Sequence, residues 1–202
     1  MLQMIETNLF LREMETDKLT GLLTRRAFIY RAKQMMDLNP DMDFDILVAD
    51  IQNFKHINFT YGEDKGDEVL AAVAKFIKLQ MREDMCARYG ADIFVCILSS
   101  ADSGRLERIN EHIKNVVESA PIPNLVIKSG IYQNVDKNLS VVQMCDRALL
   151  ALKSIKHNHS QNIARFDGGM SQKLLRNQQY EEAFQQAIAD KEFIIYYQPK
   201  YN

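Results

Sequence analysis

The chain has no tryptophan, four prolines and three cysteines among its 202 residues, and it has no long apolar run. Cys86, Cys96 and Cys145 lie far apart without a CxxC spacing, which predicts reduced thiols in a reducing compartment and excludes a disulfide framework. The apolar runs are strand-sized, shorter than the roughly 18 residues of a membrane span, and no signal peptide is visible. We therefore expect a cytoplasmic protein with no membrane segment in this chain.

No charge of one sign dominates the sequence. Lysine and arginine number 25 against 27 aspartates and glutamates, a formal net charge of −2, whereas nucleic-acid binders usually carry a strongly basic face. Hydrophobic residues make up 47%, which is ordinary for a globular protein of this length. The composition thus predicts one full domain with part of a second, and no nucleic-acid partner.

Helical and strand patterns alternate along most of the chain. Their order predicts an α/β (α+β) fold: a mixed central sheet flanked by helices, with one β-hairpin. The nearly continuous apolar run Phe44 to Ile51 is expected to be a central strand covered on both faces. The predicted helices span about 25–38, 64–80, 106–116 and 141–155, and the predicted strands about 44–51, 85–89, 92–98 and 125–132.

Breaks in the pattern predict three segments. The first has a short heptad-like stripe, which fits either the end of a coiled coil or a frayed helix. The last holds one helix, about 171–190, and one strand, 193–198, too little to form a core alone. The predicted segments are an N-terminal helix or linker at 1–16, a main domain at 17–167 and a partial domain at 168–202.

Two aspartates are candidate metal ligands. Asp50 ends the predicted central strand, where a carboxylate can bind a hard cation such as Mg²⁺. Asp92 closes the predicted hairpin turn Gly90-Ala91-Asp92, and it would share that cation if it faced Asp50. The structural alternatives are a strand-end aspartate that caps the next turn and a turn chosen for its backbone conformation.

A polar segment follows Asp50 and includes Lys55, Asn58 and Asp67. Asparagine and aspartate side chains can read a purine edge, and lysine can neutralise phosphate. The alternative is a polar loop that caps the next helix, where an early acidic residue is favoured.

Several motifs, in this order and spacing, resemble those of the GGDEF (diguanylate cyclase-like) domain over about residues 16–166. A later run, Phe193-Ile-Ile-Tyr-Tyr-Gln-Pro-Lys200, is similar to the opening strand of an EAL domain. The resemblance implies a fragment of a tandem GGDEF–EAL protein of cyclic di-GMP signalling. The GGDEF-like runs are Asp17-Lys-Leu-Thr-Gly-Leu22, Asp50-Ile-Gln-Asn-Phe-Lys-His-Ile-Asn58, Gly62, Gly66-Asp67-Glu-Val-Leu70, Arg88-Tyr-Gly90-Ala-Asp-Ile-Phe94 and Asp146-Arg-Ala-Leu149 with Lys153 and Asn158.

Active members of that family join two GTP molecules across a homodimer into cyclic di-GMP, with Mg²⁺ as cofactor. The resemblance implies GTP and an EAL domain as partners, and it carries the site over residue by residue. It assigns the metal to Asp50, the carbonyl of Ile51 and Asp92, the guanine edge to Asn58 and Asp67, and the phosphates to Lys55 and Lys153.

The sequence departs from the family pattern at the signature turn itself. Gly90, Ala91, Asp92, Ile93 and Phe94 stand where the family has Gly-Gly-Asp-Glu-Phe, so one carboxylate is lost and a methyl group is added. The product-inhibition motif Arg-x-x-Asp would fall on Met81-Arg-Glu-Asp84, which has no arginine in register. The other departures are Gln52 for a second aspartate, Phe59 and Glu63 for Asp and His, and His157 for an arginine.

Losing one preorganised charged group costs several kcal/mol of transition-state stabilisation, so we expect little or no cyclase activity and assign no catalytic residue. The favoured hypothesis is a degenerate GGDEF domain that regulates the EAL phosphodiesterase, with or without bound Mg²⁺ and GTP. The alternatives are a weak but active diguanylate cyclase and a dimerisation scaffold with an empty site.

Overall fold

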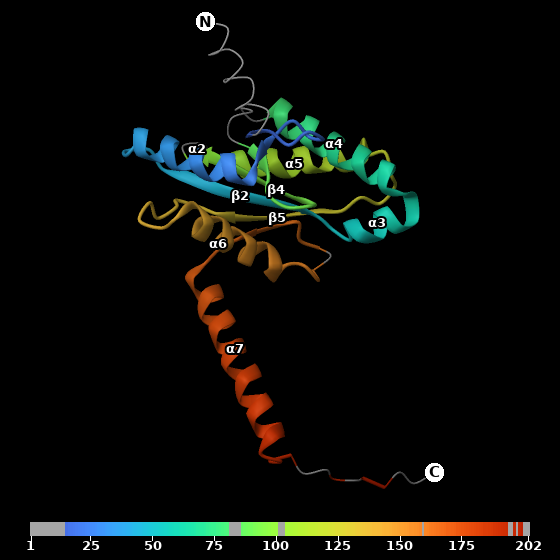
Figure 1. Ribbon diagram of the computed structural model, residues 1–202, viewed down its shortest axis with the longest axis vertical. Coiled ribbons are helices and arrows are strands. Elements are labelled where there is room, and N and C mark those ends of the chain that lie inside the picture. Colours follow the sequence, from blue (N-terminus) through green and yellow to red (C-terminus); the bar gives the residue numbers. More distant parts are fainter. Residues whose placement is uncertain are drawn as a thin grey trace, which may run out of the picture. The chain divides into compact units, whose positions relative to one another are not determined.

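The computed structural model describes residues 15–80, 86–100, 104–158, 160–193, 196, 198 and 199. The chain divides into two compact units between Phe166 and Asp167 (Figure 1). The segment predicted at 1–16 and the Met81–Asp84 motif fall almost wholly outside the described residues. The elements of the first unit are β1 Leu23–Thr24, α2 Arg25–Leu38, β2 Phe44–Ile51, α3 Phe54–Tyr61, α4 Glu63–Gln80, β3 Cys86–Arg88, β4 Ile93–Ser99, α5 Arg105–Glu118, β5 Ile127–Tyr132, α6 Val141–Ser154 and β6 Ile163–Arg165.

Six strands form one mixed sheet in the order β1-β3-β4-β2-β5-β6. Strand β2 is central and pairs antiparallel with β4 and β5, while the edge strands β1 and β6 pair in parallel with β3 and β5. The hairpin of β3 and β4 is also present. The predicted fold class is therefore confirmed, together with the central position of Phe44–Ile51.

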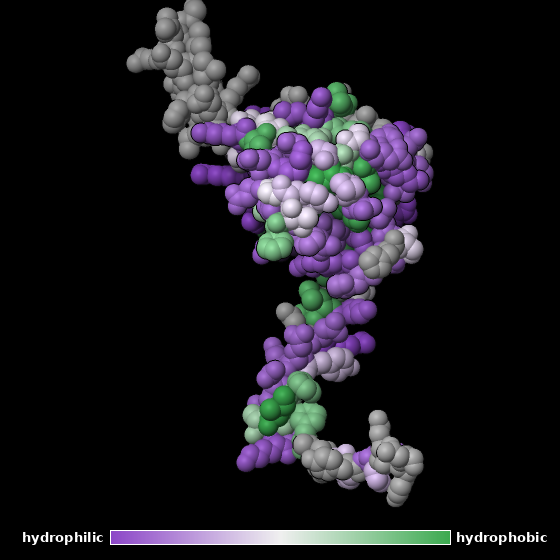
Figure 2. Space-filling model, turned by 90° about the vertical axis from the view of Figure 1, so that its right-hand side faces the viewer, coloured by the Kyte–Doolittle hydropathy of each residue, from purple (hydrophilic) through white to green (hydrophobic). Residues whose placement is uncertain are grey.

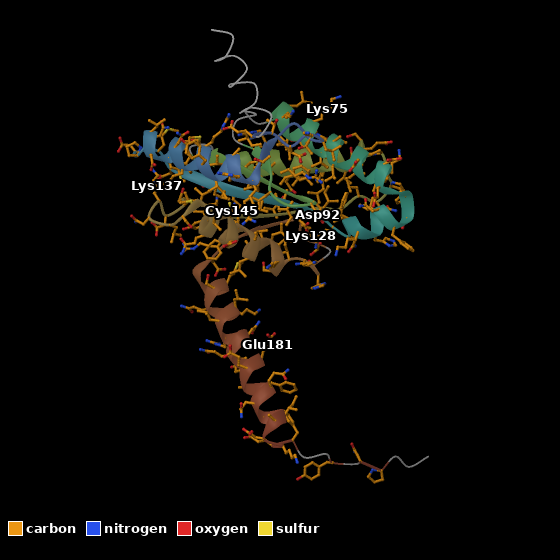
Figure 3. All side chains as sticks on the ribbon, viewed as in Figure 1. Lys75, Asp92, Lys128, Lys137, Cys145 and Glu181 are labelled. Carbon is orange, nitrogen blue, oxygen red and sulfur yellow. The ribbon has the colours of Figure 1, made fainter. Side chains whose placement is uncertain are left out.

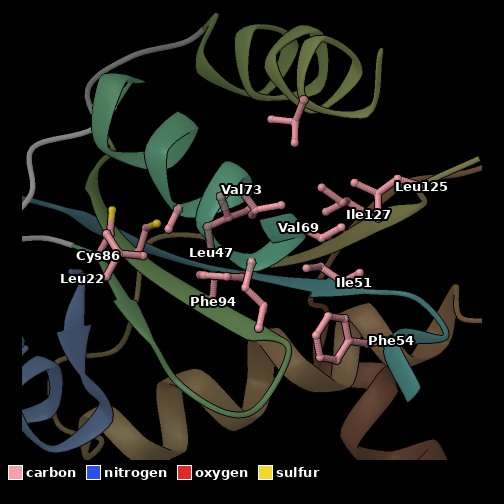
Figure 4. Packing of buried hydrophobic residues seen from close by; sticks show 14 of the residues in the cluster. Leu22, Leu47, Ile51, Phe54, Val69, Val73, Cys86, Phe94, Leu125 and Ile127 are labelled. Carbon is pink, nitrogen blue, oxygen red and sulfur yellow. The ribbon is translucent and has the colours of Figure 1, made fainter. Parts of the chain in front are cut away.

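Helices cover both faces of the sheet. Successive side chains of β2 point to opposite sides and therefore pack against different helices. Leu47 and Ile51 pack with α4 and α5 in one cluster (Figure 4), and Ile46 and Val48 pack with α2 and α6 in the other. Figure 1 shows α4 and α5 on one side of the sheet and α6 on the other. Double coverage explains why β2 reads as a nearly continuous apolar run.

Helix α6 lies against β5 at a position that only glycine permits. A Cβ added to Gly130 would stand 2.0 Å from the Ala148 carbonyl oxygen and 2.5 Å from the Leu152 nitrogen. The helix begins with a capping box, in which Ser140 and Gln143 bond reciprocally to each other's backbone N–H groups. The capping box thus fixes where α6 begins, and Gly130 of β5 allows its close approach to the sheet.

One helix was not predicted. The sequence pattern predicts no helix in the polar segment after Asp50, for which a loop was one alternative, but Phe54–Tyr61 is helix α3. It follows Asn53, whose φ of 57° is left-handed, and only Phe54 and Ile57 of its eight residues are buried. So short a helix shows too few apolar positions to reveal a 3.6-residue period. The strands β1 and β6 were not predicted either, because two or three residues are too few to show the alternating pattern of a strand.

The second unit holds α7 Gly168–Ala189, close to the helix predicted at 171–190, and the Asp167 side chain caps its start. Of the strand predicted at 193–198, the described residues Phe193, Tyr196 and Gln198 lie outside any helix or strand, and the others lie outside the described residues. Figure 2 shows apolar side chains on this unit among polar ones. The more exposed of these are Leu174, Leu175, Tyr180, Phe184, Ile188, Phe193 and Tyr196. Within the part of the chain that the structure describes, no helix has the length and apolar character needed to cross a membrane.

Candidate functional site

The two candidate metal ligands lie side by side at one end of the sheet. Asp50 is the penultimate residue of β2, and the backbone N–H of its neighbour Ile51 donates to the Asp92 carbonyl at 3.2 Å. Asp92 closes the turn of the β3–β4 hairpin, directly before β4. The structure thus brings together the three positions that the resemblance assigns to the metal.

The two carboxylates interact electrostatically. Burial and then the charge of Asp92 raise the pKa of Asp50 to about 6, against the opposing effects of a hydrogen bond from Gln52 and the charge of Lys156. The Gln52 amide nitrogen Nε2 donates to Asp50 Oδ2 at 2.5 Å. A partly buried carboxylate held near a second one is stabilised by a cation.

Magnesium fits this donor set in part. It prefers oxygen ligands and is commonly held by one or two carboxylates together with the phosphates of a nucleotide. No cluster of three or more acidic, histidine or cysteine ligands occurs among the described residues. Asp50 and Asp92 would therefore hold Mg²⁺ with phosphate oxygens completing the shell, and the ion would neutralise phosphate charge there.

Ile93 stands directly opposite Asp50 in the register of β2 and β4. Side chains directly opposite each other on neighbouring strands share a face of the sheet. Ile93 is half-buried and packs against the core cluster on the α2 and α6 side. An apolar side chain therefore lies directly across from Asp50, on the same face of the sheet.

Arg88 fixes the hairpin turn, a role that the sequence did not reveal. Its Nε and Nη2 donate to the Ala91 carbonyl at 3.1 and 2.7 Å, while Nη1 lies 3.4 Å from both carboxylate oxygens of Asp17. Burial of Asp17 is outweighed by hydrogen bonds from Thr20 and by the charge of Arg88, so the pKa of Asp17 is lowered. The turn is thus tied to the loop that precedes β1.

The candidate guanine-reading residues come from α3 and α4, which pack against each other at Asn58 and Gly66. Asn58 comes from α3, and its Oδ1 would lie 1.9 Å from a Cβ placed on Gly66 of α4. That oxygen is buried and has no hydrogen-bond partner within the described parts of the chain. Asp67 follows Gly66 and is exposed. An acceptor without a partner beside an exposed carboxylate is an arrangement that a base edge carrying N–H groups can satisfy.

The candidate phosphate ligands lie on separate helices. Lys55 is exposed on α3, and Lys153 is exposed in the last turn of α6. Lys156, three residues beyond Lys153, is the lysine whose charge acts on Asp50. The sequence did not single out Lys156 or the buried Lys128 of β5, although a lysine inside an apolar strand is a visible signal.

The chain matches the family described as "Diguanylate cyclase, GGDEF domain" over residues 14–162. It is 32% identical to diguanylate cyclase DgcM of Escherichia coli K12 over 148 residues, which are 70% of this chain and 36% of that protein. It is 35% identical to diguanylate cyclase A of Treponema denticola over 123 residues, 56% of this chain and 33% of that protein. The chain thus spans about a third of the length of these relatives.

Solved structures show the same fold. The coiled coil and GGDEF domain of DgcB from Caulobacter crescentus, in complex with c-di-GMP, superposes with a TM-score of 0.68 at 24% identity and covers 81% of this chain and 93% of that one. The S helix-GGDEF-EAL segment of Vibrio cholerae LapD, bound to c-di-GMP, gives a TM-score of 0.70 at 18% identity and covers 94% of this chain and 46% of that one. On the family match over most of its length, together with this fold, the chain belongs to the GGDEF family of diguanylate cyclase domains.

Proposed function

We propose that this GGDEF domain binds GTP with Mg²⁺ but makes little or no cyclic di-GMP, and that it regulates an EAL domain through its nucleotide state. The observation that carries the proposal is the register that sets Ile93 opposite Asp50 beside Asp92. The carboxylates needed to hold a metal are present, and the residue that faces them from the signature turn is apolar. Binding and chemistry are therefore separable in this chain.

The binding half of the proposal is supported by two places in the first unit. Asp50 and Asp92 supply the oxygen ligands that Mg²⁺ takes when it also holds phosphates. At the α3–α4 contact, the unpartnered Oδ1 of Asn58 and the carboxylate of Asp67 supply acceptors for a guanine edge. A scaffold would gain nothing from a buried acceptor left without a partner, because such a group costs about 1–3 kcal/mol.

The loss of chemistry is argued from charge. Preorganised charged groups of a catalytic site contribute about 10²–10³ each to the rate, and isoleucine stands at position 93, where the resembled signature has a glutamate. Ala91 also adds a methyl group to the turn held by Arg88. Gln52 occupies one oxygen of Asp50 with a neutral donor, which competes with a cation for that oxygen.

The EAL partner is proposed from the second unit. The structural match to the GGDEF–EAL segment of LapD extends over 94% of this chain, beyond the first unit alone. The helix α7 and the apolar residues that follow it fit the start of such a domain. We infer that the chain is part of a tandem GGDEF–EAL protein.

Isothermal titration calorimetry of the chain with GTP, in the presence and absence of Mg²⁺, tests the proposal, with GDP and ATP as comparisons. We expect GTP to bind more tightly with Mg²⁺ than without it, and ATP to bind at least about tenfold more weakly, since the acceptors of Asn58 and Asp67 do not match an adenine edge. Chromatography of the same mixture should show no cyclic di-GMP. Turnover at about one per second or faster, or no GTP binding at all, would refute the proposal.

A further inference from the structure

Lys128 is a buried cation beside the candidate site. It belongs to β5, stands directly opposite Asp50 in the register of β2 and β5, and is only 3% exposed. Lysine is almost never buried without a partner, because the ammonium loses its hydration. Figure 3 shows Lys128 and Asp92 at the same end of the sheet.

The partners of Lys128 are three backbone carbonyls just beyond helix α6. Its Nζ donates to the oxygens of Ile155 at 2.6 Å, Asn158 at 2.8 Å and Lys156 at 3.1 Å. These three bonds use all the N–H groups of the ammonium. The last carbonyls of a helix have no partner within the helix, and a cation there is favoured by the helix dipole.

The segment that Lys128 holds carries basic side chains. Lys153 lies in the last turn of α6, and Lys156 supplies both a carbonyl to Lys128 and a charge that acts on Asp50. The backbone N–H groups of Lys156 and Asn158 bond back to Lys153 and Ile155, which closes this turn around the ammonium. Lys128 itself has no N–H group left for a phosphate.

We propose that Lys128 is a positioning residue for nucleotide phosphates: it fixes the turn after α6, so that Lys156, and Lys153 just before it, can meet phosphates held by metal at Asp50. The inference rests on the proposed binding of Mg²⁺ and GTP. It assigns the phosphate side of the site to a turn built around an internal cation, while the base side depends on α3 and α4.

The chain offers a matched control. Lys137 also donates to two backbone carbonyls, those of Asn39 and Pro40, and it lies over the ring of Phe44 at the start of β2. That is the end of β2 opposite to Asp50, and Figure 3 shows Lys137 far from Lys128. Lys128→Met and Lys137→Met therefore remove the same kind of interaction at opposite ends of one sheet.

The test measures the dissociation constants of GTP and GMP with Mg²⁺ by competition against a fluorescent GTP analogue, using the full chain. We expect Lys128→Met to weaken GTP at least tenfold and to lower the ratio of GTP to GMP affinity at least fivefold, because GMP lacks two of the phosphates. Lys137→Met should leave the ratio within twofold of the wild type. A purely structural role would reduce the fraction of competent protein for both ligands equally and would leave the ratio unchanged.

Hydrogen exchange at the Lys156 and Asn158 amides supplies a readout that needs no nucleotide. Faster exchange there in Lys128→Met, with no change in Lys137→Met, is expected. If Lys128→Met does not fold, Lys128→Gln keeps N–H donors without the charge and should show a smaller change in the same direction. If exchange and the affinity ratio are both unchanged in the Lys128 variant that folds, the inference about Lys128 is wrong and the proposed function still stands. If the wild type binds neither GTP nor GMP, the proposed function is wrong as well.

Discussion

The base side of the candidate site, at α3 and α4, and its reaction side, at Asp50 and Asp92, differ in the groups that they present. On the base side, α3 and α4 meet so closely that a Cβ on Gly66 would stand 1.9 Å from Asn58 Oδ1, and the amide of Asn58 and the carboxylate of Asp67 are groups that can bond a purine edge. On the reaction side, the carboxylates of Asp50 and Asp92 are still neighbours, but Gln52 bonds to one and Ile93 lies opposite it. The first side is defined by close helix packing, and the second pairs two carboxylates with a neutral amide and an apolar side chain.

Substitutions at the turn and at the helix contact have different structural consequences. Ile93 and Ala91 sit at a hairpin turn whose backbone is fixed by Arg88, so their side chains change without moving a strand. Gly66 lies within a helix contact, where a larger residue would displace the Asn58 side chain. Under the proposed function, substitutions at the turn would therefore change the chemistry without moving a strand, whereas packing would hold the geometry of the base side.

The largest expected effect comes from restoring the turn. The double variant Ala91→Gly with Ile93→Glu returns a carboxylate beside Asp50 and removes the added methyl group. We expect cyclic di-GMP formation from GTP and Mg²⁺ to rise at least about 100-fold over the wild type, as measured by chromatography of the product. Such a gain would place the loss of chemistry at two positions of the turn.

The matched control is Ala91→Gly with Ile93→Gln, which has the same shape without the charge and should gain nothing. If the glutamate variant is equally silent while still binding GTP, then Gln52, His157 or the dimer geometry also limits the reaction, and the simple contrast between the two sides is wrong.

The next effect tests the base side. Gly66→Ala should weaken GTP about 10- to 100-fold, because the new Cβ displaces Asn58 Oδ1 and leaves a polar group of the base without its partner. The unfolding temperature should change little, because the higher helix propensity of alanine offsets part of the cost of displacing the Asn58 side chain. Calorimetry of Gly168→Ala is the control: that glycine begins α7, and a Cβ there meets nothing within 4 Å. Equal GTP affinity in the two variants would remove Asn58 from the site.

A smaller effect is expected from the Asp50 carboxyl, whose folded pKa of about 6 lies above its ordinary value of 3.8. Between these two pH values the native state binds more protons than the unfolded state, so the free energy of unfolding falls as the pH rises and then levels off above about pH 6. Asp50→Asn removes this slope. We expect its free energy of unfolding at pH 7 to exceed that of the wild type by about 1 kcal/mol, after allowance for solvent screening of a half-buried group. Its unfolding temperature should therefore be higher than that of the wild type at pH 7 and should match it near pH 4.

Magnesium sharpens this measurement, since it binds the ionised form of Asp50. With GTP present, added Mg²⁺ should stabilise the wild type at pH 7 more than at pH 5 and should have little effect on Asp50→Asn. A stability that does not vary with pH between 4 and 6 in the wild type would mean that the Asp50 carboxyl is hydrated and that Asp92 is too distant to act on it.

Much of this arrangement could be predicted from the sequence, for physical reasons that differ by element. The apolar run of β2 and the clean stripe of α6 gave bounds that differ little from those of the structure, because long buried elements repeat their pattern. The proximity of Asp50 and Asp92 also followed, since a hairpin next to a central strand places its turn at that strand's end. Helix α3 and the bonds of Arg88 and Lys128 could not be predicted. A side chain of a strand that bonds backbone carbonyls 27 to 30 residues away leaves no periodic trace in the sequence.

The smallest effect on the two sides should come from removing the second unit. Every residue of the two core clusters lies before Asp167, so a chain that ends before Gly169 should keep its unfolding temperature within about 2 °C and its GTP affinity within twofold.

The same truncation should have a larger effect on self-association. Leu175, Phe184 and Phe193 are each more than half exposed on the second unit, and exposed apolar groups of this size recruit a partner surface. We expect the full chain to self-associate through them and the shortened chain to do so less, as measured by sedimentation velocity over a range of concentrations. A full chain that stays monomeric at the highest concentrations would contradict the role of this segment in pairing, and a shortened chain that loses GTP affinity would show that the site extends beyond the first unit.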